Sequence, residues 1–326
     1  MATASSRTVA SAASAPDPAR PFLKWAGGKR QLLPQLRRFV PPRFAQYFEP
    51  CLGSGALFFD LAGSRDLDTH STWLTDLNRD LLGCYCAVGA HTDAVIAALE
   101  EHGRRHRESP HEHFYRVRDV LFNPLRSEWF GANPIAPIDE YSPALAAMFI
   151  YLNRTGFNGL FRLNSRSQFN VPPGRYANPR ICDAENIRAV SAVLSAPRVK
   201  IRYSGFELAL EHARRNDLLY FDPPYAPISD TANFTGYTAS RFSSEDQRRL
   251  QEVVIELARR GCHVIVSNST APIIRELYET NRRAQRAGLR AYQVPARRAI
   301  NSKASHRGEV AEYIISNVVP TDYCSS

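Results

Sequence analysis

The stretch Asp217-Leu218-Leu219-Tyr220-Phe221-Asp222-Pro223-Pro224-Tyr225 places a short apolar run before an aspartate and two prolines. The run from Leu218 to Phe221 has the length and aromatic content of a buried strand, which we predict here. In open α/β sheets, ligands bind at the carboxyl ends of strands, where Asp222, Pro223 and Tyr225 would lie. The prolines remove N–H donors and leave stiff carbonyl acceptors beside the Asp222 carboxylate. This pattern favours a flat heterocycle with an amino group, stacked on Tyr225; an ordinary proline-rich turn after a strand is the alternative.

A first strand–turn–helix unit lies upstream of this stretch. A short aromatic strand precedes the Gly-x-Gly turn of Gly53 and Gly55, and an apolar helical run follows over residues 56–62. A second strand at 73–75 ends in Asp76, at about the 20-residue spacing at which an acid meets ribose hydroxyls in nucleotide-binding folds. The full G-x-G-x-x-G fingerprint is absent, which disfavours a nicotinamide oxidoreductase.

The rest of the chain continues the alternation of strands and helices. This alternation predicts an α/β fold whose mainly parallel sheet carries helices on both faces. A basic loop is expected at 297–303. The further elements that we predict are helices at 183–194 and from Ser243 or Ser244 to Gly261, and strands at 198–203, 263–268 and about 310–318.

Between about Cys84 and Arg180 the composition changes. Asparagine, arginine and aromatic residues are interleaved with glycine over residues 153–176, a pattern typical of a hairpin that reads a DNA groove; a long surface loop is the alternative. Four histidines precede this segment on a stretch expected to be helical and solvated. Zinc is an alternative there, but without cysteine partners we predict no metal site. These histidines are His102, His106, His111 and His113.

Composition narrows the choice of partner and compartment. The net charge of +9 favours a polyanion, with nucleic acid as the first candidate, over a merely arginine-rich surface. The six cysteines form no CxxC pair, and no apolar run approaches a membrane span, so we expect a cytoplasmic protein with reduced thiols. The Ala/Ser-rich residues 1–20 are expected to be a disordered tail rather than a targeting segment.

Together these motifs resemble the Dam-type DNA adenine-N6 methyltransferases of the D12 class, from Pro21 to about Asn317. The blocks that carry the resemblance are LKWAGGK (23–29), FEPCLGSG (48–55), TDLN (75–78), YLNRTGFNGLFR (151–162), FNVPPGRY (169–176) and DPPYAPISDTANFTGY (222–237). The long blocks are specific to that family, whereas DPPY alone would not be.

The resemblance implies a class I methyltransferase fold of Rossmann-like type that uses S-adenosylmethionine. The catalytic domain would comprise residues 21–83 and 181–326. A mostly helical target-recognition domain with a β-hairpin, residues 84–180, would be inserted between them and read GATC from the major groove. Phe157 and Gln168 stand where tyrosine and glutamate are expected, which leaves the preference for flanking sequence open.

The resemblance also assigns roles to single residues, all of which are expectations at this point. Cofactor contacts fall to Trp25, Lys29, Asp76 and Asp222, together with the turn glycines Gly53 and Gly55. Base reading falls to Lys24, Leu160, Arg162, Pro172 and Tyr176, and Phe157 and Asn158 would hold the base stack where adenine leaves.

The chemistry follows from the weak nucleophilicity of adenine N6, which is paired inside a duplex, so the base must be flipped out. Asp222 and the Pro223 carbonyl would accept the two amine hydrogens and direct the nitrogen lone pair at the methyl group, without a covalent enzyme intermediate. Aspartate instead of asparagine before the prolines disfavours the protein-glutamine methyltransferases. We therefore predict a monomeric enzyme for double-stranded DNA, solitary or paired with a restriction enzyme. Cytosine-N4 or RNA adenine methylation and an inactive DNA-binding protein are the alternatives.

Overall fold

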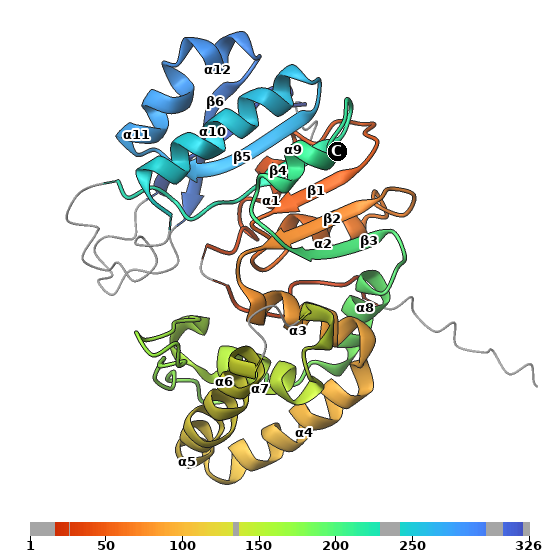
Figure 1. Ribbon diagram of the computed structural model, residues 1–326, viewed down its shortest axis with the longest axis vertical. Helices are drawn as coiled ribbons and strands as arrows, with labels where there is room; N and C mark the ends of the chain where they lie inside the picture. The colour runs from red at the N-terminus through yellow and green to blue at the C-terminus, as the bar shows by residue number, and fades with distance from the viewer. Residues whose placement is uncertain (1–16, 26, 133–136, 229–241, 298–308, 322–326) are drawn as a thin grey trace, which may run out of the picture.

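A seven-stranded sheet forms the centre of the molecule, in the order β3-β2-β1-β4-β5-β7-β6 (Figure 1). The computed structural model describes residues 17–25, 27–132, 137–228, 242–297 and 309–321. Strands β3, β2, β1, β4 and β5 are parallel, and β7 runs antiparallel to both of its neighbours. The strands are β1 (Tyr47–Pro50), β2 (Thr72–Asp76), β3 (Val199–Tyr203), β4 (Leu218–Phe221), β5 (His263–Ser269), β6 (Arg290–Arg297) and β7 (Glu309–Ser316). The mainly parallel sheet that the sequence predicts is confirmed.

Each face of the sheet packs into its own apolar cluster. Tyr47 and Leu218 belong to one cluster, and their chain neighbours Phe48 and Leu219 belong to the other, as the two-residue period of a strand requires. The first face is covered by α1 (Leu33–Arg37), α2 (Ala56–Gly63), α3 (Arg79–Ala90) and α8 (Ala184–Leu194). The second face is covered by α9 (Leu208–His212), α10 (Ser244–Arg259), α11 (Pro272–Ile274), η6 (Arg275–Glu279) and α12 (Arg282–Arg286). Helices therefore lie on both faces, as predicted.

The strands and helices that we predicted by residue range are present, whereas strand β6 and the short helices α1, α9, α11 and α12 were not predicted. Ser243 caps α10 and forms a capping box with Asp246. Strand β6 was not predicted, because its arginines and Pro295 are untypical of a strand interior. Since β6 pairs only with β7, it is an edge strand, where proline is tolerated. Of the expected basic loop, residues 298–303 lie outside the described residues.

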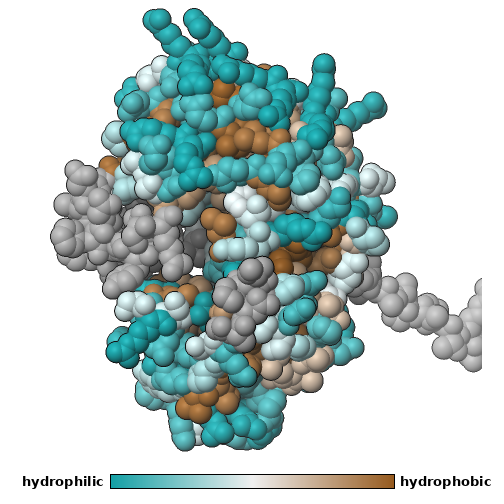
Figure 2. All heavy atoms as spheres, viewed as in Figure 1, coloured by the Kyte–Doolittle hydropathy of each residue, from teal (hydrophilic) through white to brown (hydrophobic). Residues whose placement is uncertain are grey.

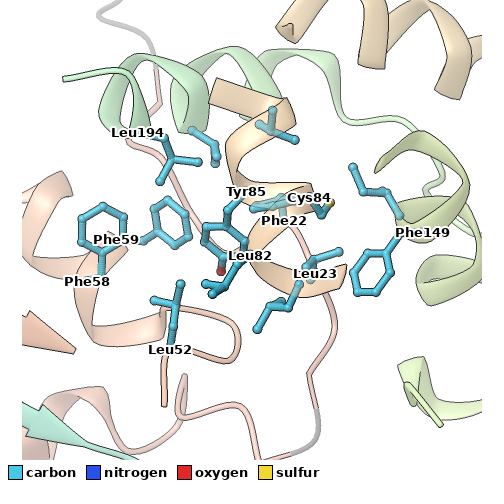
Figure 3. Close-up of a cluster of buried hydrophobic side chains, with 14 of the residues drawn as sticks. Phe22, Leu23, Leu52, Phe58, Phe59, Leu82, Cys84, Tyr85, Phe149 and Leu194 are labelled. Carbon is cyan, nitrogen blue, oxygen red and sulfur yellow. The ribbon is translucent and has the colours of Figure 1, made fainter. Parts of the chain in front are cut away.

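A helical layer lies between β2 and β3 in sequence and below the sheet in Figure 1. It contains α4 (Thr92–Glu108), α5 (Pro110–Tyr115), the π-helix η1 (Arg116–Phe122), α6 (Asn123–Ala132), η2 (Ile138–Glu140), α7 (Pro143–Thr155) and η3 (Phe157–Gly159). Its apolar residues join the first face of the sheet in one continuous cluster, in which Tyr85 lies between Phe58 of α2 and Phe149 of α7 (Figure 3). The helical layer therefore shares its core with the sheet.

The segment after α7 folds back on itself as a hairpin. Antiparallel bridges join Gly156 to Pro173 and Leu163 to Phe169. The turn is closed by Asn164, whose Oδ1 accepts hydrogen bonds from the Arg166 and Gln168 N–H groups at 2.9 and 3.0 Å. A buried ion pair between α6 and α3 supports the turn. Arg126 Nη2 lies 2.8 Å from Asp80 Oδ2, and Arg126 Nη1 donates to the Ser167 carbonyl. The predicted hairpin is thus present.

Three of the four histidines of α4 and α5, His102, His106 and His113, gather around Tyr151, whereas His111 contacts Tyr115. His102 Nδ1 lies 3.2 Å from His113 Nε2, and His106 Nδ1 lies 2.9 Å from the Tyr151 hydroxyl. The expectation that these histidines are solvated is wrong for His113, which is 5% exposed. Burial lowers the pKa of both His102 and His113 to about 4, so neither adds positive charge at neutral pH. Within the described ranges, no group of three or more metal-ligating side chains is placed to hold an ion.

Residues 17–20 were expected to belong to a disordered tail. Ala19 is buried and Arg20 Nη2 lies 2.8 Å from Asp183 Oδ2, whereas Asp17 and Pro18 are exposed. Across the described part of the chain, no single helix has the length and apolar content to cross a membrane; the bent pair α3 and α4 passes by length and composition alone.

Candidate active site

The loop after β4 places Asp222, Pro223 and Tyr225 at the carboxyl end of the central strands, as predicted. Two buried amides hold this loop. Gln247 of α10 donates from Nε2 to the Pro224 carbonyl at 2.9 Å, and Asn268 of β5 donates to Gln247 Oε1 at 3.0 Å. The Pro224 carbonyl therefore points toward the buried Gln247 side chain.

The Pro223 carbonyl accepts no hydrogen bond from any residue that the structure describes, in contrast to its neighbour Pro224. Beyond Tyr225, the Ala226 N–H donates to Asn268 Oδ1 at 3.1 Å. The loop is therefore fixed on both sides of Tyr225, while Pro223 keeps an acceptor for an outside donor. Asn268 was not predicted as a site residue, although it is a polar residue next to the end of β5, much as Asp222 follows β4.

Asp222, Lys29 and Tyr225 form the charged centre of the site. Lys29 Nζ lies 2.9 Å from Asp222 Oδ1 and 4.4 Å from the centre of the Tyr225 ring. Lys29 Nζ also donates to the Gly27 carbonyl at 2.5 Å. The structure therefore brings together residues that the sequence assigned separately to catalysis and to cofactor binding.

Burial and neighbouring carboxylates shape the acidity of this centre. Burial raises the pKa of Asp222, Lys29 opposes the shift, and Glu312 adds to it. Glu312 of β7 accepts a hydrogen bond from the Tyr225 hydroxyl at 2.8 Å, which fixes the ring. Burial likewise raises the pKa of Glu49 on β1 to about 8. Because a raised pKa makes a carboxylate a stronger base, Asp222 is suited to receiving a proton.

The turn after β1 meets the end of β2. Gly53 and Gly55 both have positive φ, +51° and +63°. The Gly53 N–H donates to Asp76 Oδ2 at 3.1 Å, and the Asn78 N–H donates to Asp76 Oδ1 at 2.8 Å. A Cβ at Gly53 would lie 2.9 Å from Trp25 Cδ1, so only glycine lets the turn pass this close to the indole. Four predicted cofactor residues are therefore adjacent.

This group of residues fits S-adenosylmethionine. Each oxygen of the Asp76 carboxylate has further lone pairs that can accept ribose hydroxyls. Burial raises the pKa of Asp76 despite its backbone hydrogen bonds. Leu77, the next residue, is 65% exposed and offers an apolar surface to an adenine ring. Leu77 was not predicted as a site residue. Its position directly after Asp76 at the end of a strand is the signal that could have indicated it.

The proposed base readers other than Lys24 lie in the segment after α7, which contains the hairpin. Lys24 Nζ lies 3.9 Å from the centre of the Tyr176 ring, and the Phe157 N–H donates to the Pro172 carbonyl at 2.9 Å. Asn158 takes a left-handed conformation with φ of 52°. Phe157 and Tyr176 are 48% and 36% exposed, whereas hydrophilic residues cover most of the face seen in Figure 2. Exposed aromatic rings in this position are suited to contact with bases.

Arg162 lies on the first arm of the hairpin and is oriented by Asn170 on the second arm. Its Nε donates to Asn170 Oδ1 at 2.8 Å, and Nη2 donates to the Asn170 carbonyl at 3.3 Å. Leu160, two residues earlier, is half-buried, and its N–H donates to the Phe157 carbonyl. The guanidinium is therefore held before any ligand arrives, which lowers the entropy cost of binding.

A cavity of about 750 Å³ lies between α3 and the edge strand β3, next to the turn after β1, since the Tyr85 hydroxyl donates to the Gly53 carbonyl at 3.2 Å. Tyr85, Ile201 and Tyr203 contribute to its wall, and neither Asp76 nor Asp222 does. The candidate site is therefore a set of strand ends and loops rather than this cavity.

Comparison with known proteins gives a consistent result. Residues 25–292 match the family described as D12 class N6 adenine-specific DNA methyltransferase. The chain is 38% identical to the Type II methyltransferase M1.LlaDCHI of Lactococcus lactis, covering 91% of this chain and 95% of that one. It is 36% identical to the Type II methyltransferase M.MjaIII of Methanocaldococcus jannaschii, with coverages of 91% and 99%. It is 34% identical to the DNA adenine methylase of Escherichia coli K12, with coverages of 90% and 94%.

Among solved structures, the chain is similar to a precorrin-6y C5,15-methyltransferase from Geobacter metallireducens. The identity is 9%, the TM-score is 0.34, and the coverages are 91% and 97%. This similarity is too low to add to the argument.

Proposed function

The chain belongs to the D12 class N6 adenine-specific DNA methyltransferases, and we propose that it methylates N6 of a flipped adenine in GATC, with Asp222 and Pro223 as the acceptors of the amine hydrogens. The observation that carries the proposal is the loop after β4. A half-buried carboxylate, a carbonyl without a partner among the described residues and a fixed aromatic ring stand together there.

The chain's own residues provide binding, orientation and proton transfer. When bound, S-adenosylmethionine supplies a methyl group on a sulfonium, which is electrophilic. Trp25, Gly53 and Asp76 are proposed to hold that cofactor at the ends of β1 and β2, one strand away from Asp222.

The target base is proposed to stack on the ring of Tyr225, which Glu312 holds. Its amine would donate one hydrogen to Asp222 and the other to the Pro223 carbonyl, which exposes the nitrogen lone pair to the methyl group. Lys29 would have to give up part of its contact with Asp222 as the amine arrives. After transfer the nitrogen must lose a proton, and the raised pKa of Asp222 favours this carboxylate as the acceptor.

Sequence reading is proposed for the hairpin and Lys24. A guanidinium can engage guanine N7 and O6 together in the major groove, and Arg162 is already oriented for such a contact. Phe157 and Asn158 would fill the gap that the flipped adenine leaves. The same proposal takes double-stranded DNA as the substrate and a cytoplasmic location for the protein. It also takes the enzyme to be a monomer, since one chain carries both the site after β4 and the hairpin.

The GATC assignment is tested with plasmid DNA that the purified protein has methylated. The plasmid is digested with pairs of restriction enzymes that cut GATC but differ in sensitivity to adenine methylation. We expect protection only from the enzyme that adenine methylation blocks. Complete cutting by both enzymes, with methyl groups incorporated elsewhere, would assign a different recognition sequence.

Asp76→Ala is expected to weaken binding of S-adenosylmethionine on the order of 10-fold or more, because hydrogen bonds to a charged group are worth about 1.5–3 kcal/mol. The measurement is calorimetric titration of the cofactor. Affinity for a GATC duplex without cofactor should change little, because Asp76 lies in the cofactor group and not on the hairpin. Unchanged cofactor affinity would move the ribose contact to another residue.

A further inference from the structure

The amide of Asn153, near the end of α7, is 3% exposed and joins two segments that are far apart in sequence. Its Oδ1 accepts the Lys24 N–H at 2.8 Å, and its Nδ2 donates to the Lys24 carbonyl at 2.7 Å. The same Nδ2 donates to the Gly159 carbonyl at 2.9 Å. Both hydrogens of the amide are used on carbonyls and its oxygen on an N–H group, so the partners leave the amide one orientation.

Lys24 and Gly159 are also in direct contact. Gly159 has a φ of +64°, and a Cβ added to it would lie 2.4 Å from Lys24 Cβ. No larger residue fits without moving one of the two segments. The backbone of Lys24 is therefore pressed against the turn 157–160 and locked there by Asn153.

One of the two joined segments leads to the proposed cofactor site, and the other leads to the hairpin that is proposed to read the DNA bases. Trp25, next to Lys24, packs against Gly53 in the turn that meets Asp76. On the other side, the Trp25 ring stacks on Phe161 with centroids 6.3 Å apart and an interplanar angle of 18°. Phe161 stands between Leu160 and Arg162, so one indole touches both the cofactor turn and the hairpin.

We propose that Asn153 is a positioning residue that couples cofactor binding to DNA reading, by making residues 24–25 and the turn 157–160 one rigid unit. A cofactor that settles against Trp25 and Gly53 then also sets the position of Lys24, Phe157 and Asn158. DNA that orders the turn acts on the cofactor through the same contacts. The inference rests on the proposed function, since it takes the cofactor and DNA contacts from there.

The chain contains a matched control in Asn186 of α8. This amide is also 3% exposed, accepts the Arg20 N–H at 3.0 Å and donates to the Arg20 carbonyl at 3.0 Å. It therefore holds the same N-terminal segment with the same geometry, but four residues upstream and without a bond to the hairpin. Losing Asn186 should cost stability without touching the coupling.

The experiment measures the dissociation constant of a GATC duplex with and without saturating S-adenosylhomocysteine, for the full-length wild type, Asn153→Ala and Asn186→Ala. The ratio of the two constants is the coupling factor, and by linkage DNA must change the affinity for S-adenosylhomocysteine by the same factor. Allosteric couplings are about 5- to 150-fold. We expect a wild-type factor of at least about 5 and a factor below about 2 in Asn153→Ala, with Asn186→Ala equal to wild type.

A purely structural role would weaken both ligands and leave the ratio unchanged, so a wild-type ratio in Asn153→Ala would overturn the inference. A wild type that binds both ligands with a ratio of one would also overturn it, while leaving the proposed function intact. A wild type that binds neither ligand would refute the proposed function itself. Where Asn153→Ala melts below the assay temperature, Gly159→Ala separates the same two segments from the other side and must also lower the ratio.

Discussion

Asp222→Ala is expected to lower the rate of methyl transfer on the order of 10³-fold, the upper end of what a single preorganised electrostatic contact contributes. The variant loses one of the two acceptors that hold the target amine and the carboxylate that receives the proton. It also removes the partner of Lys29, which lies 2.9 Å from Asp222 Oδ1. The measurement is the single-turnover rate with preassembled enzyme, cofactor and duplex, so that weaker binding cannot imitate slower chemistry.

Asp217→Ala serves as the matched control at the opposite end of the same strand. The Asp217 carboxylate accepts hydrogen bonds from the Gln46 N–H at 3.0 Å and the Arg214 N–H at 2.7 Å, so its role is structural. We expect Asp217→Ala to lower the melting temperature without slowing the single-turnover step. DNA affinity should be nearly normal in Asp222→Ala, and a near-normal rate in that variant would remove Asp222 from the mechanism.

Arg162→Ala is expected to relax specificity at one guanine-containing pair of the site by about 1–3 kcal/mol, roughly 5- to 150-fold. The structure supports a specific role, because Asn170 holds the guanidinium from the other strand of the hairpin. The measurement is methylation of GATC against each single-base variant. A salt titration of binding to a non-specific duplex runs alongside.

Arg166→Ala is the comparison within the same hairpin, since Arg166 is exposed at the turn. An arginine that contacts only phosphate lowers affinity uniformly and flattens the salt dependence. We expect that behaviour from Arg166→Ala if the turn touches DNA, and base-specific loss from Arg162→Ala. Equal losses on all sequences with Arg162→Ala would make it a phosphate contact and leave the guanine reader unidentified.

The strands that carry the site could be predicted because each is short, apolar and followed by a residue with a functional group. Leu218 to Phe221 shows this most plainly, since four consecutive apolar residues followed by Asp222 and two prolines fit a short buried strand that ends at the prolines. Strand β6 escaped prediction for the opposite reason. An edge strand is half-solvated and tolerates arginine and Pro295, so its sequence is close to that of a loop.

The residues that hold the site in place could not be predicted, because their partners are distant in sequence. Gln247 looks like any polar residue of an amphipathic helix, and only the fold shows that it meets the Pro224 carbonyl. Glu312 follows residues 298–308, which lie outside the described part of the chain, and reaches Tyr225 from the antiparallel strand β7. Asn153 lies within the block YLNRTGFNGLFR, but its three hydrogen bonds to backbone groups depend on the packing of α7 against residues 22–24.

The most direct test of the central claim identifies the atom that receives the methyl group. The wild-type protein is incubated with S-adenosylmethionine carrying a radiolabelled methyl group and a duplex with one GATC site, and the nucleosides are then separated by chromatography. We predict that the label is found as N6-methyladenine, confined to the GATC adenine. Label on cytosine N4, transfer to RNA but not to the duplex, or no transfer at all would contradict the account.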